Sequence, residues 1–264
     1  MSRTLPLGVL VALTLWSLVA PAHAQTPEQE SADTIRNDSD PTRAVLFSIR
    51  PEFSWLNTDV SRSAVIFRYD HAALRQRRWL PGRRGVILRF EMPIAQTNTA
   101  SSGETGLGDA YAQLLTVPYF TARFAFVIGS GLGVPTATDA LLGSGRWVVS
   151  PITGPVWFFR GRGMFLVRVQ NSMTVGSDAE RPDFNLFIVA PTFVHTVGGR
   201  FWVLADTETR TDWLQDERTS IKSGVQFGRA IAGRVGVWVK PEVWWGPNPG
   251  GQWNLKFGVV WYRP

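Results

Sequence analysis

The sequence predicts an all-β fold, a closed antiparallel transmembrane β-barrel of about 12 strands, preceded by a signal peptide and a short disordered leader. Three observations predict it. From Arg43 onward apolar and polar residues alternate with period two, and clusters of Gly, Pro, Asp and Ser interrupt the alternation at regular intervals. Tryptophan is abundant, with 12 residues, in a chain without cysteine. No window after residue 43 is apolar over the roughly 18 residues that a membrane-spanning helix needs.

The N-terminal 24 residues have the features of a signal peptide. Arg3 makes a basic start, residues 5–19 are apolar, and Ala22-His23-Ala24 is a small-x-small cleavage site. Residues 25–42 are polar, acidic and without periodicity, so we expect a disordered periplasmic leader. The barrel is expected over residues 43–264. The absence of cysteine excludes disulfides and lipoprotein attachment.

Cutting the chain at the turn clusters predicts twelve strands, an even number, as single-chain bacterial barrels require. They span 44–57, 62–75, 85–98, 106–118, 121–135, 146–159, 162–176, 183–197, 200–214, 219–231, 234–246 and 252–263. From the fourth strand on, short links (VPYFT, RGR, VGG, AG) alternate with longer ones (PTATDALLGSG, GSDAERP, QDERT, PNPGG). Residues 76–84 break this rule. The alternation is typical of short periplasmic turns and longer extracellular loops.

Each strand has one apolar set of alternate residues, which we assign to lipid, and one polar set, which we assign to the interior. In the first strand Phe47, Ile49 and Phe53 point outward, while Arg50 and Glu52 point inward. A one-residue slip would place the charges in lipid, so the register is strongly specified. The predicted binding residues are the charges that line the lumen: Arg50, Glu52, Arg68, Asp70, Arg89, Glu91, Asp109, Arg168, Asp206, Glu208, Arg210, Lys222, Lys240, Glu242 and Lys256.

A cation and an acid one residue apart recur four times, as RPE, RYD, RFE and KPE, and each time both charges lie on the inner face. We expect cross-strand ion pairs, which can brace the wall, line a narrow pore, or do both. Pro51 and Pro241 face outward in two of these motifs, and we expect a bulge or a bend at each because proline lacks a backbone donor.

Aromatic residues near the strand ends predict two interfacial girdles. On the side of the long loops they are Trp55, Trp147, Trp213, Trp244, Trp245 and Trp253, and on the side of the short turns they are Trp157, Trp202, Trp261 and Tyr262.

Motifs for catalysis are weak. After residue 24 the only histidines are His71 and His195, both far from any serine in a recognisable motif. Asp206 and Glu208 could host an aspartate-based protease site, but Arg210 beside them favours charge balance. GSGLGV at 129–134 has no helix after it, so we expect its glycines to thin a strand wall. We predict no enzyme activity, no metal site and no cofactor.

Two stretches together resemble a known family. GLGDAYAQL (106–114) and GSGLGVPTATDALLGSGRWVVSPITGP (129–155) are similar to a Gram-negative outer-membrane β-barrel family labelled as transporters of the phenol meta-cleavage pathway type. Ala137 stands where that family commonly has glycine. The resemblance implies a barrel associated with uptake of aromatic or hydrophobic compounds. KFGVVWYRP at the C-terminus resembles the assembly signal of outer-membrane barrels, although Arg263 replaces the last aromatic residue.

We therefore expect an outer-membrane channel for passive passage of small, aromatic or hydrophobic molecules through a narrow lumen of mixed charge. The alternatives are a structural or adhesion barrel whose lumen is closed by ion pairs, and a lipid-modifying hydrolase. The expected partners are outer-membrane lipid and lipopolysaccharide, the barrel-assembly machinery and an unidentified small solute. The net charge of +6 is spread over many turns, so nucleic acid is not among them.

Overall fold

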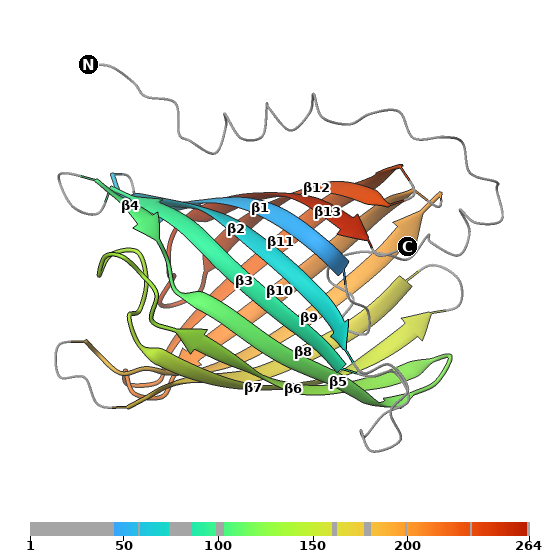
Figure 1. Cartoon of the computed structure of the whole chain (residues 1–264), viewed down its shortest axis with the longest axis horizontal. Coiled ribbons are helices and arrows are strands. Elements are labelled where there is room, and N and C mark those ends of the chain that lie inside the picture. The colour runs from blue at the N-terminus through green and yellow to red at the C-terminus, as the bar shows by residue number, and fades with distance from the viewer. Residues whose placement is uncertain are drawn as a thin grey trace.

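The computed structural model describes residues 45–57, 59–73, 86–98, 103–159, 163–176, 181–198, 200–232 and 234–262. The predicted signal peptide, the leader and the long link at 76–84 lie outside these residues. The described chain contains thirteen antiparallel strands (Figure 1): β1 Val45–Trp55, β2 Ser61–Ala73, β3 Val86–Thr97, β4 Glu104–Leu107, β5 Ala110–Phe120, β6 Phe124–Val134, β7 Trp147–Phe159, β8 Gly163–Val175, β9 Asn185–Val197, β10 Phe201–Asp212, β11 Arg218–Ala232, β12 Val235–Trp245 and β13 Trp253–Tyr262. No helix among the described residues is long and apolar enough to cross a membrane.

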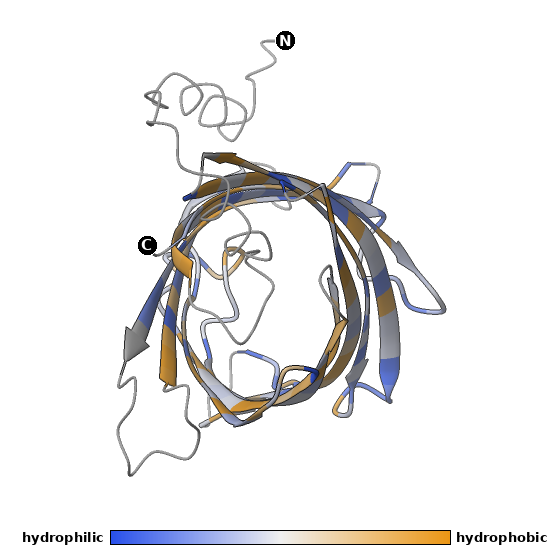
Figure 2. Cartoon of the chain, turned by 90° about the vertical axis from the view of Figure 1, so that its right-hand side faces the viewer, coloured by the Kyte–Doolittle hydropathy of each residue, from blue (hydrophilic) through white to orange (hydrophobic). Residues whose placement is uncertain are grey.

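The strands close into a barrel of twelve long strands, with β4 as a short addition. Each long strand pairs with the long strands before and after it in sequence, so β3 pairs with β5 as well as with β4, and β13 pairs with both β12 and β1. The closing register runs through Trp55↔Trp253 and Ile49↔Val259. Seen along its axis, the sheet forms a complete ring (Figure 2). The predicted closed antiparallel barrel is confirmed.

From β5 on, the links alternate in length as predicted. One end carries the short links 121–123, 160–162, 198–200 and 233–234, and the other carries the longer links 135–146, 176–184, 213–217 and 246–252. Below, the two are called the turn end and the loop end of the barrel. In Figure 1 the loop end is the end where β4 lies.

The predicted strand 106–118 is wrong as one element, because it is divided at Gly108 and Asp109. β4 continues along β3 in the register Ile94↔Leu107, and Gly108 N donates to Pro93 O at 2.9 Å. The other edge of Leu107 is occupied by the loop 135–146, since Thr138 N donates to Leu107 O at 3.0 Å. β5 then begins at Ala110 with β6 as its partner. The loop therefore takes the place that a continuous strand would have used.

Apolar side chains cover the outer face. Phe90, Tyr119 and Phe227 are 49%, 56% and 53% exposed, although they lie within strands. Contacts between outward rings follow the predicted alternation, with Phe47 lying 6.5 Å from Phe67 and 5.6 Å from Trp261 between centroids. Trp55 and Trp253 stack at 3.6 Å on the loop-end side of the seam. A face of this kind is stable against lipid rather than water.

The sequence predicts a bulge or a bend at Pro51 and Pro241. The strand prolines interrupt the ladder without shifting its register, so there is no bulge at either, but the ladder has a gap at each. Between β1 and β13 one register holds from Ile49↔Val259 to Glu52↔Lys256, and the two pairs between them are missing. Pro51 still lies opposite Val65 of β2. Pro241 behaves in the same way, pairing with Leu255 of β13 while two pairs toward β11 are missing. A missing N–H thus costs hydrogen bonds on one edge only.

Several aromatic residues expected in the girdles instead point inward. Trp202 and Tyr262 are buried near the turn end, in one cluster with Val45, Trp238 and Val260. The rings lie flat over glycines, since a Cβ at Gly228 would overlap Trp202 and one at Gly258 would overlap Trp238. The glycines leave room on the wall that a broad ring then fills.

Adding a side chain under one of these rings should destabilise the barrel. Gly258→Val should lower the free energy of unfolding by about 1–3 kcal/mol, because the Trp238 ring has to move. Urea unfolding of the refolded protein in detergent measures the change. Ala112→Val is the control, because Ala112 lies on the outer face between Phe90 and Leu132. Equal effects of the two substitutions would contradict this account.

Candidate functional site

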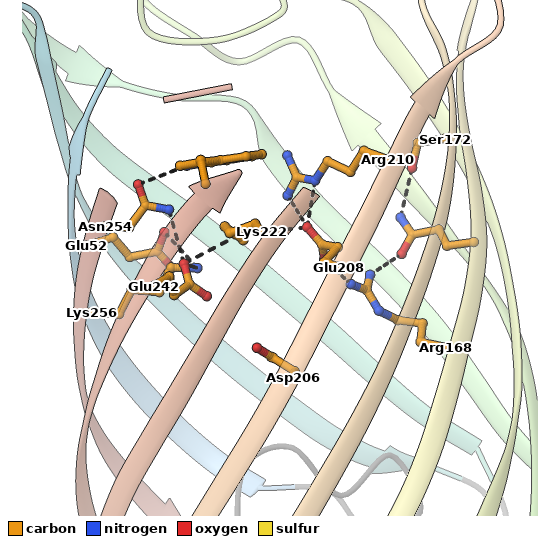
Figure 3. A network of polar contacts seen from close by, with 12 residues as sticks. Glu52, Arg168, Ser172, Asp206, Glu208, Arg210, Lys222, Glu242, Asn254 and Lys256 are labelled. Carbon is orange, nitrogen blue, oxygen red and sulfur yellow. Dashed lines mark hydrogen bonds and ion pairs between the residues drawn. The ribbon is translucent and has the colours of Figure 1, made fainter. Parts of the chain in front are cut away.

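Most of the predicted lumen charges are joined in one network of ion pairs on the inner face (Figure 3). The network starts at Glu91 and Arg50, which are 3.7 Å apart, and ends at Glu208 and Arg168, which are 2.5 Å apart. Below it is called the wall network. Its eleven members are Arg50, Glu52, Glu91, Arg168, Asp206, Glu208, Arg210, Lys222, Lys240, Glu242 and Lys256.

Glu242 lies at the centre of the wall network. Its side chain is 1% exposed, and its oxygens lie 3.5, 3.0 and 3.1 Å from the Nζ atoms of Lys222, Lys240 and Lys256. Asn254 Nδ2 also donates to Glu242, at 3.1 Å. Lys240 and Lys256 are directly opposite each other in the ladder, where like charges repel. The carboxylate of Glu242 offsets that repulsion.

Small residues allow the charges to meet across an intervening strand. Lys240 Nζ of β12 reaches Asp206 Oδ2 of β10 at 2.5 Å, crossing β11 at Gly224. A Cβ at Gly224 would lie 2.9 Å from Cε of Lys240, so a side chain at this position would force Lys240 to move. In the same way as Gly224, the buried Ala190 of β9 lies on the strand that Arg168 of β8 crosses to reach Glu208 of β10.

A second cluster surrounds Asp70, which is completely buried. Arg68 donates to Asp70 at 3.0 and 2.8 Å, and Arg89 donates to it at 3.0 and 3.2 Å. Val45 N, at the start of β1, donates to Asp70 Oδ2 at 3.3 Å. The cluster therefore connects β1, β2 and β3 on the inner face. Buried ion pairs of this kind hold a wall together when every partner is satisfied.

Asp109 has a role that sequence alternation does not reveal. Its carboxylate accepts from Ser144 Oγ at 2.8 Å, from Gly145 N at 3.0 Å and from Ala137 N at 3.1 Å. It anchors the loop 135–146 and lies outside the wall network. Arg62 Nη2 of β2 holds the same loop by donating to Leu142 O at 2.6 Å. Leu142 itself is 1% exposed, so the loop is packed against the barrel.

A cavity of about 390 Å³ lies in the barrel interior, because eight strands from β1 around to β10 line it. Its walls carry both charge and apolar surface. The charged part includes Arg50, Arg89, Glu91, Arg168, Asp206 and Glu208, and the apolar part includes Leu115, Val127, Ile152, Val156, Leu166 and Leu204.

Sequence reasoning missed the uncharged members of the inner face. Trp244, expected in a girdle, lies 5.4 Å from Arg210 and 5.2 Å from Lys222 (centroid distances) and donates from Nε1 to Asn254 Oδ1 at 3.4 Å. Gln170 accepts a hydrogen bond from Arg168 and donates one to the Ser172 hydroxyl, which is in turn hydrogen-bonded to the Ser150 hydroxyl. Trp244 and Gln170 share the alternation of Glu242 and Arg168, but an uncharged residue gives no further signal that it belongs to the interior.

The histidines lie with aromatic residues of the outer face. Tyr69 and Phe193, each two residues away in the same strand, are 42% and 44% exposed. His71 Nδ1 is 3.5 Å from the Tyr69 hydroxyl, and His195 stacks on Phe193. Neither arrangement activates a serine or threonine nucleophile. Within the described ranges, no group of three or more His, Cys, Asp or Glu is placed to hold a metal ion.

Glu242 should be far more important for stability than Glu91. Glu242→Gln leaves three lysines around a neutral buried amide, so we expect a loss of about 3–5 kcal/mol in the free energy of unfolding. Glu91→Gln is the matched control, since Glu91 is 20% exposed and its ion pair with Arg50 spans 3.7 Å. Its cost should be below about 1 kcal/mol. Urea unfolding in detergent compares them, and similar losses would refute the central place of Glu242.

Asp109→Ala should release the loop 135–146 while the barrel stays folded. The substitution removes three acceptor contacts from the loop, at Ala137, Ser144 and Gly145. Limited proteolysis should then cut the loop about ten times faster, since local opening governs cleavage. Asp139→Ala is the control, because the Asp139 carboxylate bonds within the loop, to Leu141 N at 2.8 Å. Unchanged cleavage of Asp109→Ala would show that other contacts hold the loop.

Comparisons with known proteins support the fold. No family model matches the sequence, and no curated protein matches it. Among solved structures, the COG4313 outer membrane channel from Pseudomonas putida F1 is similar with a TM-score of 0.66 at 14% identity, covering 86% of this chain and 100% of that one. KdgM porin has a TM-score of 0.55 at 11% identity and covers 83% and 99%. NanC porin has a TM-score of 0.55 at 8% identity and covers 82% and 100%.

At these identities the similarity concerns architecture. Membership of the phenol meta-cleavage family stays a prediction. What the comparisons and the strand pairing establish together is a twelve-stranded antiparallel barrel of the kind found in outer-membrane channels.

Proposed function

We propose that this protein is an outer-membrane channel for the passive passage of small molecules, among them aromatic or apolar ones. The observation that carries the proposal is the cavity inside the barrel, lined on one part by charges and on another by apolar side chains. The apolar outer face supports a place in lipid, and the similarity to channel structures supports the class. The turn end would then face the periplasm and the loop end the medium.

The cavity supports a channel for small solutes rather than a wide pore. Its volume of about 390 Å³ lies within the usual range of small-molecule sites. The loop 135–146 is held at the loop end by Asp109 and Arg62, where it can limit the size of what enters. Arg50, Arg168 and Asp206 on the cavity wall are the residues to which we assign selectivity.

The second candidate function is a structural barrel whose interior is closed by ion pairs. It is favoured by the wall network itself, because a chain of pairs that runs from β3 through β1 to β8 braces the wall. A braced barrel and a selective channel use the same charges. The two functions differ in whether these charges affect the passage of ions through the barrel.

Planar-bilayer conductance and solute uptake into proteoliposomes test the proposal. The wild-type protein should conduct and should admit small neutral solutes. Glu52→Gln should shift the reversal potential toward anion preference, because it removes one of the interior carboxylates beside Lys256 and Arg50. Arg229→Gln is the control, since Arg229 lies over Phe201 on the outer face.

One outcome would reject the channel: the absence of both conductance and uptake in protein whose heat-modifiable gel mobility shows that it is folded. Conductance whose ion selectivity stays unchanged in Glu52→Gln and Glu242→Gln, while both variants lose stability, would reject a role of the wall network in selectivity and leave it the role of bracing the barrel.

A further inference from the structure

The wall network has more cations than carboxylates, and its most exposed charged side chains are those of Arg168 and Arg210. Glu208 is the one carboxylate of the wall network in contact with Arg168 and with Arg210, at 2.5 Å from each, and Lys222 approaches it at 3.7 Å. Its side chain is 13% exposed, whereas those of Arg168 and Arg210 are 36% and 35% exposed. Two guanidinium groups thus share one largely buried acid, and their remaining surface is accessible.

The surplus holds for the two clusters of ion pairs taken together. Among the described members of the wall network and the Asp70 cluster, eight cations accompany six carboxylates. The cations are Arg50, Arg68, Arg89, Arg168, Arg210, Lys222, Lys240 and Lys256, and the carboxylates are Glu52, Asp70, Glu91, Asp206, Glu208 and Glu242. The carboxylates of the wall network are at most 22% exposed, less than either arginine on Glu208. An anion beside Glu208 therefore meets more exposed charge than a cation does there.

Arg168 is placed to act on a ligand in the cavity. It lines the cavity together with Glu208, and its contacts run from Nη1 to Gln170 and from Nη2 to Glu208. Leu166, two residues before Arg168 on the same face of β8, lines the apolar part with Val156 and Leu204. A guanidinium fork beside apolar surface matches a planar carboxylate on an apolar body.

Arg210 lies farther toward the loop end, next to Trp244. The Arg210 guanidinium is 5.4 Å from the Trp244 ring centroid, and the Trp244 ring packs near Gly250 and Gly251 of the 246–252 link. Figure 3 shows Arg210 and Arg168 on the same carboxylate, Glu208. A carboxylate that enters from the loop end would therefore meet the Arg210 guanidinium first and the Arg168 guanidinium next. An aromatic ring beside the first cation also suits a ligand with an apolar body.

From these contacts the geometry points to a binding site for small amphiphilic carboxylates in the cavity, with Arg168 as the residue that recognises the carboxylate and the Leu166 side as the surface that takes the apolar body. This rests on the proposed channel function and names its substrate class. The carboxylate only binds and passes through, and no covalent bond forms or breaks.

Equilibrium binding to the folded protein in detergent tests the site without requiring transport. Isothermal titration with phenylacetate should give saturable binding above a protein-free detergent blank. Benzyl alcohol, which has a similar apolar body and no charge, and phenethylamine, which is a cation, should bind more weakly. Arg168→Gln should weaken phenylacetate binding about tenfold, the usual value of a charged hydrogen bond. It should leave benzyl alcohol unchanged.

Two further variants separate recognition from folding. Arg168→Lys keeps the charge and loses the fork, so its affinity for phenylacetate should lie between those of the wild type and Arg168→Gln. Arg229→Gln removes an outer-face arginine that lies 5.1 Å from the Phe201 ring centroid, and it should bind phenylacetate like the wild type. Heat-modifiable mobility confirms folding of each variant, and if Arg168→Gln does not fold, Arg168→Lys and the ligand comparison on the wild type decide the question.

The site and the channel can fail separately. Wild-type protein that conducts but binds phenylacetate no better than benzyl alcohol or phenethylamine would overturn the carboxylate site and leave the channel standing. Equal weakening by Arg168→Gln and Arg229→Gln would also overturn the site. Selective binding of phenylacetate by protein that neither conducts nor admits solutes would confirm the site and reject the channel.

Discussion

The closing seam between β1 and β13 is the constraint on which the rest of the structure depends. A sheet in lipid must have no open edge, because unpaired backbone groups find no water there. β13 meets this need by pairing with β1 and β12, although the ladder between β1 and β13 has a gap at Pro51. Lys256 of β13 lies 3.8 Å from Glu52 beside that gap and 3.1 Å from Glu242, so ion pairs inside the wall reinforce the seam.

From the seam the wall network extends in both directions. The cost of removing its charges from water is offset because each buried carboxylate has several cations and hydrogen-bond donors around it. Glu242 has three lysines and an amide around it, and Asp70 has two arginines and a backbone N–H. The same arrangement leaves Arg168 and Arg210 sharing one acid at the cavity. Bracing and selectivity thus come from one set of residues, of which the two arginines on Glu208 are the most exposed.

Much of the fold could be predicted because alternate residues of a barrel strand face lipid and the interior, so apolar and polar residues alternate in the sequence. The inward set of β1, β10 and β12 agrees with the prediction, and so does the alternation of short and long links. The division of the predicted strand 106–118 was missed because it depends on the loop 135–146, which bonds to Leu107 and Asp109 from about 30 residues away. Trp202 and Trp244 were misplaced because a tryptophan near a strand end suits a girdle or a glycine-backed interior equally well.

The sequence by itself determined the class of fold, the register and which charges share the inner face, because a period of two residues is a local property of a strand. It did not determine which charges pair. Lys240 reaches Asp206 across Gly224, and Arg168 reaches Glu208 across Ala190, so each pair joins strands that are not neighbours. RPEFSW and KPEVWW show the difference: their alternation places Arg50, Glu52, Lys240 and Glu242 inside, but only the closed ring brings Glu52 and Glu242 to the same lysine. Contacts of that kind depend on curvature and closure, which exist only in the assembled barrel.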